Sequence, residues 1–433
     1  MARPPPACPG GDLLPFRPQV VSGASVHPHL AAWSWRDAAA LLVSPPPVAL
    51  AARWQQASAD DLLDRILAVH PPAQPDPGLA LALLEHSWQG SDLHQLRGRA
   101  DALRRSLMGD TVTYVVNRNL NASNLCVQRC SFCAFRRDPG QAGAYWLTTL
   151  ELQQRARQAQ DAGATELCVQ GGLNPLAQVN GSHLAYAEQL LDALQEAAPG
   201  IHLHAFSPQE LLFFAERDGL QLELVLQRLQ RAGLGSVPGT AAEVLSERLR
   251  RRICPEKLSA RAWVAVMLEV HRAGLASTST LLAGHIEQAA DLAAHLLTLV
   301  AIQARARRDG VPGFSEFVLL PFIGEAAPAV LRGQVGRDQP DQLAMLRLTA
   351  LARLILGAWI PAHQPSWVKL GLDGATEALT WGCNDLGGTL MEEHITTMAG
   401  ARGGSFQSPA DLRRAASRLH RPVRQRTTLY GSV

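Results

Sequence analysis

From residue 111 onward, short strand-like runs alternate with longer runs whose apolar residues have helical spacing. Within 149–162 and 288–305 apolar residues recur every three or four positions, which predicts helices buried on one face. The segments with strand character are 111–117, 166–170, 201–206, 233–237, 277–283, 314–321, 359–370 and 382–385. Eight strand–helix units over about 280 residues match a TIM-type (β/α)8 barrel, the α/β fold we predict. An open doubly wound sheet is the alternative, but no G-x-G-x-x-G follows the first strand.

Two of the predicted strands have one polar face. In 201–206, His202 and His204 alternate with apolar residues, and in 166–170 Glu166, Cys168 and Gln170 do the same. Strands of an ordinary barrel are apolar on both faces. A polar inner face therefore predicts a lumen that holds a substrate, with His202 and His204 pointing into it. The other interpretation is that these strands lie at a solvated edge.

The N-terminal part of the chain is rich in proline. Fourteen of the 28 prolines precede Gly78, and proline resists both helix and sheet. We expect residues 1–50 to be either poorly ordered or extended chain wrapped on the rest, and to be dispensable for chemistry. An amphipathic helix is predicted over 58–70, capped by Ser58, within an N-terminal helical extension over 51–110. The barrel core is expected over 111–345, with a C-terminal region over 346–433 completing it.

Composition excludes several classes of partner. The net charge of +2 lacks the basic excess typical of nucleic-acid or acidic-membrane binding, so neither is expected. No uncharged apolar run approaches the roughly 18 residues of a membrane span. Seven cysteines, an odd number, do not indicate a disulfide framework, and free thiols fit a reducing cytoplasm.

Three cysteines lie close together in one short stretch. Cys126, Cys130 and Cys133 have the spacing C-x3-C-x2-C. Three thiolates can hold three irons of a [4Fe–4S] cube and leave the fourth iron open to another ligand. A zinc site would need a fourth ligand, and no His or Cys follows soon after; a chance grouping of structural cysteines is the other alternative. The remaining cysteines are interpreted as free thiols: Cys8, Cys168, Cys254 and Cys383.

Two glycine-containing segments end predicted strands. Gln170-Gly171-Gly172 ends the second strand, where missing side chains let a ligand approach the backbone; a plain turn is the alternative. Gly233-Leu-Gly-Ser-Val-Pro-Gly-Thr240 precedes a helix predicted to start near Ala242, whose N-terminus could receive a carboxylate.

The cysteine spacing resembles that of the radical S-adenosylmethionine (SAM) enzymes, whose open iron binds SAM. From about Asp92 onward the chain resembles subunit 2 of the deazaflavin (FO) synthases, the 5-amino-6-(D-ribitylamino)uracil–L-tyrosine 4-hydroxyphenyl transferases. The matching segments are 113–119, 133–135, 169–172, 202–208, 235–243, 284–285, 366–371 and 384–394. Two departures are Asn174, where many members have histidine, and the proline-rich N-terminus.

The resemblance implies a reaction and its cofactors. Cys126, Cys130 and Cys133 would hold a [4Fe–4S] cluster that cleaves SAM to a 5′-deoxyadenosyl radical. That radical would abstract hydrogen from L-tyrosine, and the released 4-hydroxybenzyl group would join C5 of 5-amino-6-(D-ribitylamino)uracil. The product would be 5-amino-5-(4-hydroxybenzyl)-6-(D-ribitylimino)-5,6-dihydrouracil. It would pass to FO synthase subunit 1, the partner radical SAM subunit, and an electron donor would be needed.

The candidate site residues are assigned from the family resemblance and from the alternation of side chains along the predicted strands. The residues expected at SAM are Phe132, Gln170, Gly171 and Gly172, although Phe132 could instead anchor the core. The residues expected to act on the substrates are His202, His204 and Lys369, placed in the lumen by alternation along strands. The functional alternatives are a menaquinone-pathway radical SAM enzyme of the aminofutalosine or cyclic futalosine type, and a non-catalytic iron–sulfur or zinc module.

Overall fold

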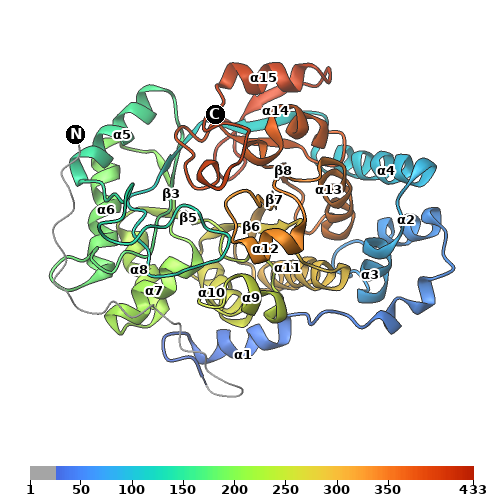
Figure 1. Cartoon of the computed structure of the whole chain (residues 1–433), viewed down its shortest axis with the longest axis horizontal. Helices are drawn as coiled ribbons and strands as arrows, with labels where there is room; N and C mark the ends of the chain where they lie inside the picture. Colours follow the sequence, from blue (N-terminus) through green and yellow to red (C-terminus); the bar gives the residue numbers. More distant parts are fainter. Residues whose placement is uncertain (1–25) are drawn as a thin grey trace.

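The computed structural model describes residues 26–433, and its centre is a ring of parallel strands (Figure 1). Seven strands form one sheet in chain order, and every neighbouring pair is parallel. They are β2 (Asn117–Leu120), β3 (Glu166–Val169), β4 (His202–Ala205), β5 (Leu234–Val237), β6 (Ala276–Ala283), β7 (Phe314–Pro321) and β8 (His363–Pro365). Parallel neighbours in chain order require a crossover between each pair, which is the βαβ repeat of a TIM-type barrel.

A second, three-stranded sheet closes the ring. Its order is β10 (Val423–Gln425), β1 (Val112–Val115) and β9 (Asp385–Gly388). The Asn384 amide donates to the His363 carbonyl at 3.1 Å, which joins β9 to β8. The Asn119 amide donates to the Leu390 carbonyl at 2.7 Å, which joins the end of β9 to β2. The predicted TIM-type barrel is therefore confirmed.

Three predicted strands differ from the observed ones, and one of them, 382–385, shares only its last residue with β9 (Asp385–Gly388). The segment 111–117 is divided, because β1 pairs with β9 and β10 whereas β2 pairs with β3. The segment 359–370 contains only the three-residue β8, followed by helix α14 (Trp367–Ala378). Lys369 therefore lies on a helix, and the prediction that placed it on a strand is wrong. Its apolar neighbours gave the segment a strand-like composition, but the chain turns into a helix after Pro365.

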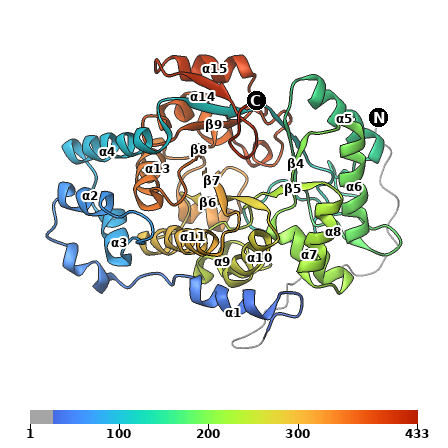
Figure 2. The same cartoon turned by 180° about the vertical axis from the view of Figure 1, so that it is seen from behind.

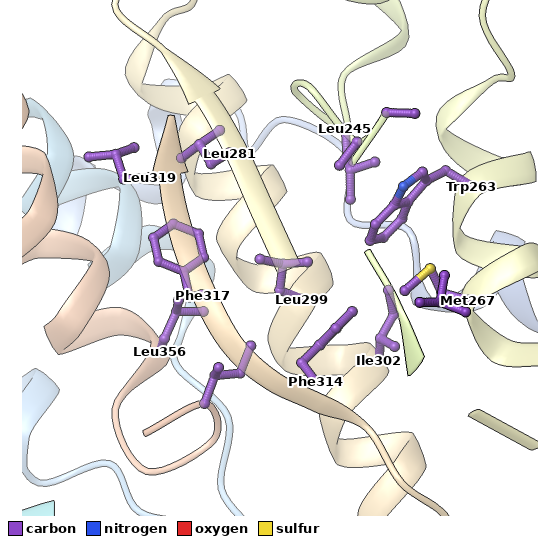
Figure 3. Packing of buried hydrophobic residues seen from close by; sticks show 14 of the residues in the cluster. Leu245, Trp263, Met267, Leu281, Leu299, Ile302, Phe314, Phe317, Leu319 and Leu356 are labelled. Carbon is purple, nitrogen blue, oxygen red and sulfur yellow. The ribbon is translucent and has the colours of Figure 1, made fainter. Parts of the chain in front are cut away.

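Helices cover the outside of the barrel. They are α5 (Thr149–Asp161), α6 (His183–Ala197), α7 (Pro208–Asp218), α8 (Leu222–Arg231), α9 (Glu247–Ile253), α10 (Ala260–Arg272), α11 (Ala289–Asp309), α12 (Ala329–Val335), α13 (Gln342–Leu356), α14 and α15 (Pro409–Ser417). Figure 3 shows how the outward faces of β6 and β7 pack: Leu281, Phe317 and Leu319 point toward the helix layer, where Leu299 and Ile302 lie. Burial of these apolar faces holds the barrel together.

An N-terminal extension runs along one side of the barrel (Figure 2). Its elements are α1 (Ala32–Leu41), the 3-10 turns Val48–Leu50 and Ala52–Trp54, α2 (Ala59–Leu67), α3 (Pro77–Glu85) and α4 (Gly90–Met108). The predicted helix over 58–70 is confirmed as α2, which Ser58 caps through a capping box with Asp61.

Helix α1 corrects the expectation for residues 1–50. Trp35 on α1 is 5% exposed, the Arg261 guanidinium lies 4.1 Å from the centre of its ring, and the Ser34 hydroxyl donates to Glu269 on α10 at 2.5 Å. The expectation of poor order is wrong for this segment, because tryptophan burial offsets the proline content around it. Residues 1–25, and with them Cys8, lie outside the described part of the chain. Between residues 26 and 433, no helix is both long and apolar enough to cross a membrane.

Candidate active site

A cavity of about 430 Å³ occupies the inside of the barrel and opens at the carboxyl ends of the strands. That volume is in the range of small-molecule sites. Its wall follows the predicted alternation: on β6 and β7, Thr278, Thr280 and Glu316 line the cavity, whereas Leu281 and Phe317 pack outward. The inner face of the barrel therefore carries polar side chains together with Leu282, Val318 and Leu320. Because β3 and β4 each have a strand on both sides, the alternative that they form a solvated edge is wrong.

The cluster motif lies on the loop after β2, at the mouth of this cavity. Cys126, Cys130 and Cys133 all line it, and all are free thiols. The Val127 amide donates to the Leu173 carbonyl at 3.1 Å and the Gly172 amide to the Ser123 carbonyl at 2.8 Å, so the loop is tied to the end of β3. Burial raises the pKa of the Cys130 thiol, and the nearby Lys257 ammonium opposes that shift.

The three thiols fit a cluster with an open iron. They come from one loop and face one space large enough for a further ligand. Within residues 26–433, no three His, Cys, Asp or Glu side chains are grouped as ligands of a single ion. A cube differs from such a site because each thiolate binds a different iron. Of the other described cysteines, Cys254 and Cys383 are buried and do not line the cavity, although Cys254 packs in the apolar cluster beside Cys130, and Cys168 lines the cavity deeper on β3.

The segment Gln170–Gly172 lines the cavity beside the cluster loop. Gln170 accepts from the Thr240 hydroxyl at 3.0 Å, and the Gly171 amide donates to Glu210 at 3.1 Å. A Cβ at Gly172 would lie 2.2 Å from the Leu125 carbonyl oxygen. The structure thus gives Gly172 a role that the sequence did not suggest: it allows the cluster loop itself to approach β3.

Glu210 is a site residue that our sequence analysis missed. It is buried on α7, and its carboxylate accepts from the Ser207 amide and hydroxyl as well as from Gly171. Burial raises its pKa to about 7. The available signal was Ser207-x-x-Glu210, a capping-box pattern directly after β4.

Phe132 lies between the cavity and a small apolar cluster. Its ring lines the cavity and also packs with Cys254, Leu282 and Phe322. The Lys257 ammonium lies 5.4 Å from the ring centre. Phe132 is therefore partly a packing residue, and its expected place near SAM stays a prediction.

The segment after β5 places charged side chains at the mouth of the cavity. Glu243 accepts from the Lys257 ammonium at 2.6 Å. Burial opposes the ionised form of Glu243, but Lys257 outweighs it and the pKa falls. Ala241 and Glu243 have φ of +64° and +47°, so this backbone is strained and irregular. The helix predicted near Ala242 begins only at Glu247, and the predicted helix N-terminus at this segment is wrong.

Lys369 lines the cavity at its mouth although it lies on a helix. Burial lowers the pKa of its ammonium to about 8, and the carboxylates of Glu243 and Glu393 oppose that shift. The other three Lys and Arg residues that line the cavity, within the described chain, are each ion-paired: Arg136, Lys257 and Arg426. No ion pair joins Lys369 to any described residue, so its ammonium is free to bind a ligand.

The two predicted histidines share one partner. His204 Nδ1 and His202 Nε2 each lie 2.7 Å from the Ser236 hydroxyl oxygen. A hydroxyl has one proton, so it donates to one ring and accepts from the other. Burial lowers the pKa of His204 to about 4. Only His204 lines the cavity; His202 lies behind Ser236.

The inner end of the cavity contains groups that sequence reasoning did not identify. Arg426, which follows β10, binds Glu316 at 3.0 Å and Asp385 at 2.5 Å. The Tyr430 hydroxyl donates to Glu316 at 2.6 Å. Alternation along β7 would have indicated Glu316, whereas nothing local indicates that the C-terminal tail enters the barrel.

Asn174 lies outside the main cavity. It is 4% exposed, its Oδ1 accepts from the Leu176 amide at 3.0 Å, and its side chain contacts the Ser123 hydroxyl at 3.4 Å. The departure at this position therefore affects the support of the Gln170–Gly172 segment and not the cavity wall.

Comparisons with known proteins agree with this geometry. The family model of the radical SAM superfamily matches residues 120–299, and the model of the CofH/MqnC C-terminal region matches 311–416. Among solved structures, methylornithine synthase is similar with a TM-score of 0.62 at 16% identity, covering 84% of this chain and 97% of its own. The hydrogenase maturase HydG has a TM-score of 0.65 at 15% identity, covering 88% and 80%. These two likenesses support the fold alone.

Sequence relatives are much closer. A 5-amino-6-(D-ribitylamino)uracil–L-tyrosine 4-hydroxyphenyl transferase from Gloeobacter violaceus is 57% identical over 78% of this chain and 86% of its own length. The enzyme of the same name from Synechocystis sp. is 56% identical over 77% and 86%. The chain therefore belongs to the family of the 5-amino-6-(D-ribitylamino)uracil–L-tyrosine 4-hydroxyphenyl transferases, within the radical SAM superfamily.

Proposed function

We propose that this chain joins the 4-hydroxybenzyl group of L-tyrosine to C5 of 5-amino-6-(D-ribitylamino)uracil in deazaflavin (FO) biosynthesis. The observation that carries the proposal is the cavity, which has the three cluster thiols at its mouth and hydrogen-bonding groups along its whole depth. Relatives with this activity in their names share more than half of its residues over most of the chain.

The residues at the mouth divide into cofactor ligands and supports. Cys126, Cys130 and Cys133 would hold a [4Fe–4S] cluster, which would supply the electron that cleaves SAM to a 5′-deoxyadenosyl radical. Phe132 and the Gln170–Gly172 segment form the wall against SAM, and the covered barrel keeps water from the carbon radicals. The chain also requires an electron donor.

Lys369 and His204 take the substrate-binding roles. The unpaired ammonium of Lys369 binds the tyrosine carboxylate, which a lysine can do as a compact point charge. His204, neutral because burial lowers its pKa, offers one ring nitrogen to the edge of the uracil. His202 does not contact the substrate: it orients His204 through the Ser236 hydroxyl.

The product passes to FO synthase subunit 1, which is the proposed partner. A cytoplasmic location is also proposed, because an oxygen-sensitive cluster and free thiols require a reducing compartment.

Anaerobic incubation with SAM, a reductant, tyrosine and the diaminouracil tests the function. We expect 5′-deoxyadenosine and the benzylated dihydrouracil to form together. SAM cleavage with futalosine-pathway substrates, but not with tyrosine and the diaminouracil, would instead support the menaquinone alternative. Failure to cleave SAM after cluster reconstitution would contradict both enzymes.

A further inference from the structure

The inner end of the cavity presents mainly hydrogen-bond acceptors. Glu166 and Glu316 are about 5% and 6% exposed and point carboxylates into it. Asn119 and Gln364 line the same space, and their buried amide oxygens have no hydrogen-bond partner among the described residues. His204 uses Nδ1 for Ser236, and no described group is bonded to its Nε2. Buried acceptors without partners are costly, so they indicate a ligand that brings donors.

Of these acceptors, Glu166 lies far from the cluster loop, whereas Asn119 and His204 pair with Cys168, two residues nearer the mouth. Glu166 begins β3, and Gln170 follows its last residue. At about 3.3 Å per residue, four residues separate the two positions by about 13 Å along the strand. The radical generated at the mouth must meet tyrosine first, because tyrosine gives up the hydrogen atom. The acceptor of the benzyl fragment therefore lies deeper in the barrel than tyrosine.

The charges at the mouth and at the inner end of the cavity favour the same placement of the two substrates. At the inner end Arg426 is neutralised by Glu316 and Asp385, and Glu166 adds a further carboxylate. An amino-acid carboxylate placed there would meet like charges and no free cation. At the mouth, the unpaired Lys369 offers that cation. Tyrosine is thus favoured at the mouth and a neutral ligand rich in O–H and N–H donors at the inner end.

The C-terminal tail forms the floor of this inner end. The Arg426 amide donates to the Tyr114 carbonyl at 2.8 Å, which continues the pairing of β10 with β1 and fixes the tail beside β1. Arg426 and Thr428 line the cavity, and Tyr430 binds Glu316. This segment lies beyond residue 416, where the match to the CofH/MqnC C-terminal family model ends.

We propose that the inner end, floored by residues 426–430, is the subsite for the ribityl chain of the diaminouracil. Its hydroxyl groups donate to the oxygens of Gln364, Asn119 and the two glutamates, and the uracil ring faces His204 and the mouth. This assignment depends on the proposed function for the identity of the ligand.

The test compares two ligands on the cluster-loaded protein with SAM and without reductant. Calorimetry measures binding of 5-amino-6-(D-ribitylamino)uracil, of 5,6-diaminouracil, which lacks the ribityl chain, and of tyrosine. Gln364→Met removes the amide oxygen at similar side-chain length, and Asn119→Ala is an independent second variant. Gln342→Met is the matched control, because Gln342 likewise donates to a glutamate, Glu377, but on the surface of α13.

We expect Gln364→Met to weaken binding of the ribityl compound about tenfold, as for one lost hydrogen bond. Binding of 5,6-diaminouracil and tyrosine should stay at the parent value, and Gln342→Met should change nothing. The subsite assignment would be overturned if Gln364→Met or Asn119→Ala weakened the binding of both uracils equally or weakened the binding of tyrosine. It would also be overturned if neither variant changed the affinity for the ribityl compound. Product formation by the unaltered protein is a separate measurement: its absence with intact binding contradicts the proposed function and leaves the subsite standing.

Discussion

Gly172 offers a direct test of how the barrel holds the cluster loop. Its φ lies outside the left-handed region, so Gly172→Ala adds a methyl group without backbone strain. That methyl group would lie 2.2 Å from the Leu125 carbonyl oxygen and 3.0 Å from Cys126 Cβ. Ordinary contact begins near 3.4 Å, so the loop must move by about 1.2 Å. The displaced atoms belong to Cys126, a proposed cluster ligand, and to Leu125 before it.

The cost follows from packing. Forcing a methyl group into a filled site destabilises a protein by about 1–3 kcal/mol, and backbone atoms on both sides leave little room to relax. Gly171→Ala should be milder, because its nearest neighbour, the Ser123 carbonyl oxygen, would be 3.2 Å away. Gly333→Ala on α12 is the matched control: nothing lies within 4 Å, and alanine favours a helix by about 1 kcal/mol over glycine.

The assay combines iron and sulfide content after anaerobic reconstitution with urea unfolding of the cluster-free chain. We expect Gly172→Ala to lose the most cluster and to show the largest fall in urea midpoint, and Gly171→Ala to lose less. Gly333→Ala should lose neither cluster nor stability. The reasoning is refuted if Gly172→Ala binds iron and unfolds like the parent. It is also refuted if the three variants lose cluster to the same extent.

Four further outcomes are expected. Replacing any one of the three cluster cysteines by Ala should abolish SAM cleavage, whereas Cys254→Ser should retain full iron content, as elemental analysis would reveal. Because the Lys369 ammonium is half deprotonated at its pKa of about 8, its charged fraction falls about tenfold from pH 7 to pH 9. Tyrosine binding should weaken by about the same factor, and Lys369→Met should remove that part of the pH dependence. His204→Ala should still cleave SAM but lose coupled product; product at the parent rate would make His204 structural. Trp35→Ala should cost about 3–5 kcal/mol in urea unfolding, and a neutral effect would show that α1 contributes little.

The pKa values of His204 and Glu316 determine how the folding stability changes at acidic pH. Burial lowers the folded-state pKa of His204 to about 4, below the 6.5 of an ordinary histidine. Between those values the unfolded chain binds the proton that the folded chain excludes, so stability falls as the pH drops from 6.5 toward 4. Glu316, whose folded-state pKa burial raises to about 7, acts oppositely: its contribution falls as the pH rises from 4.5 to 7.

The sequence by itself determined what local chemistry can specify. Alternation along 166–170 and 201–206 predicted a polar inner face, because successive strand side chains point to opposite sides. The cysteine spacing predicted the place of the cluster, since three ligands on one short loop need no distant partner. Ser58 marked the start of α2, because capping is a contact over three residues.

Tertiary structure decided everything that depends on distant partners. Lys369 lines the cavity from the first turn of helix α14, which begins directly after β8. Helix α1 is ordered because Trp35 packs against Arg261 on α10, and no local sequence pattern predicts that contact. The floor of the barrel is a further example. Arg426 and Glu316 are 110 residues apart in the chain, and only the closed ring of strands brings them into contact. Local propensity fixes the elements, whereas packing between segments far apart in the chain fixes which charges share a cavity.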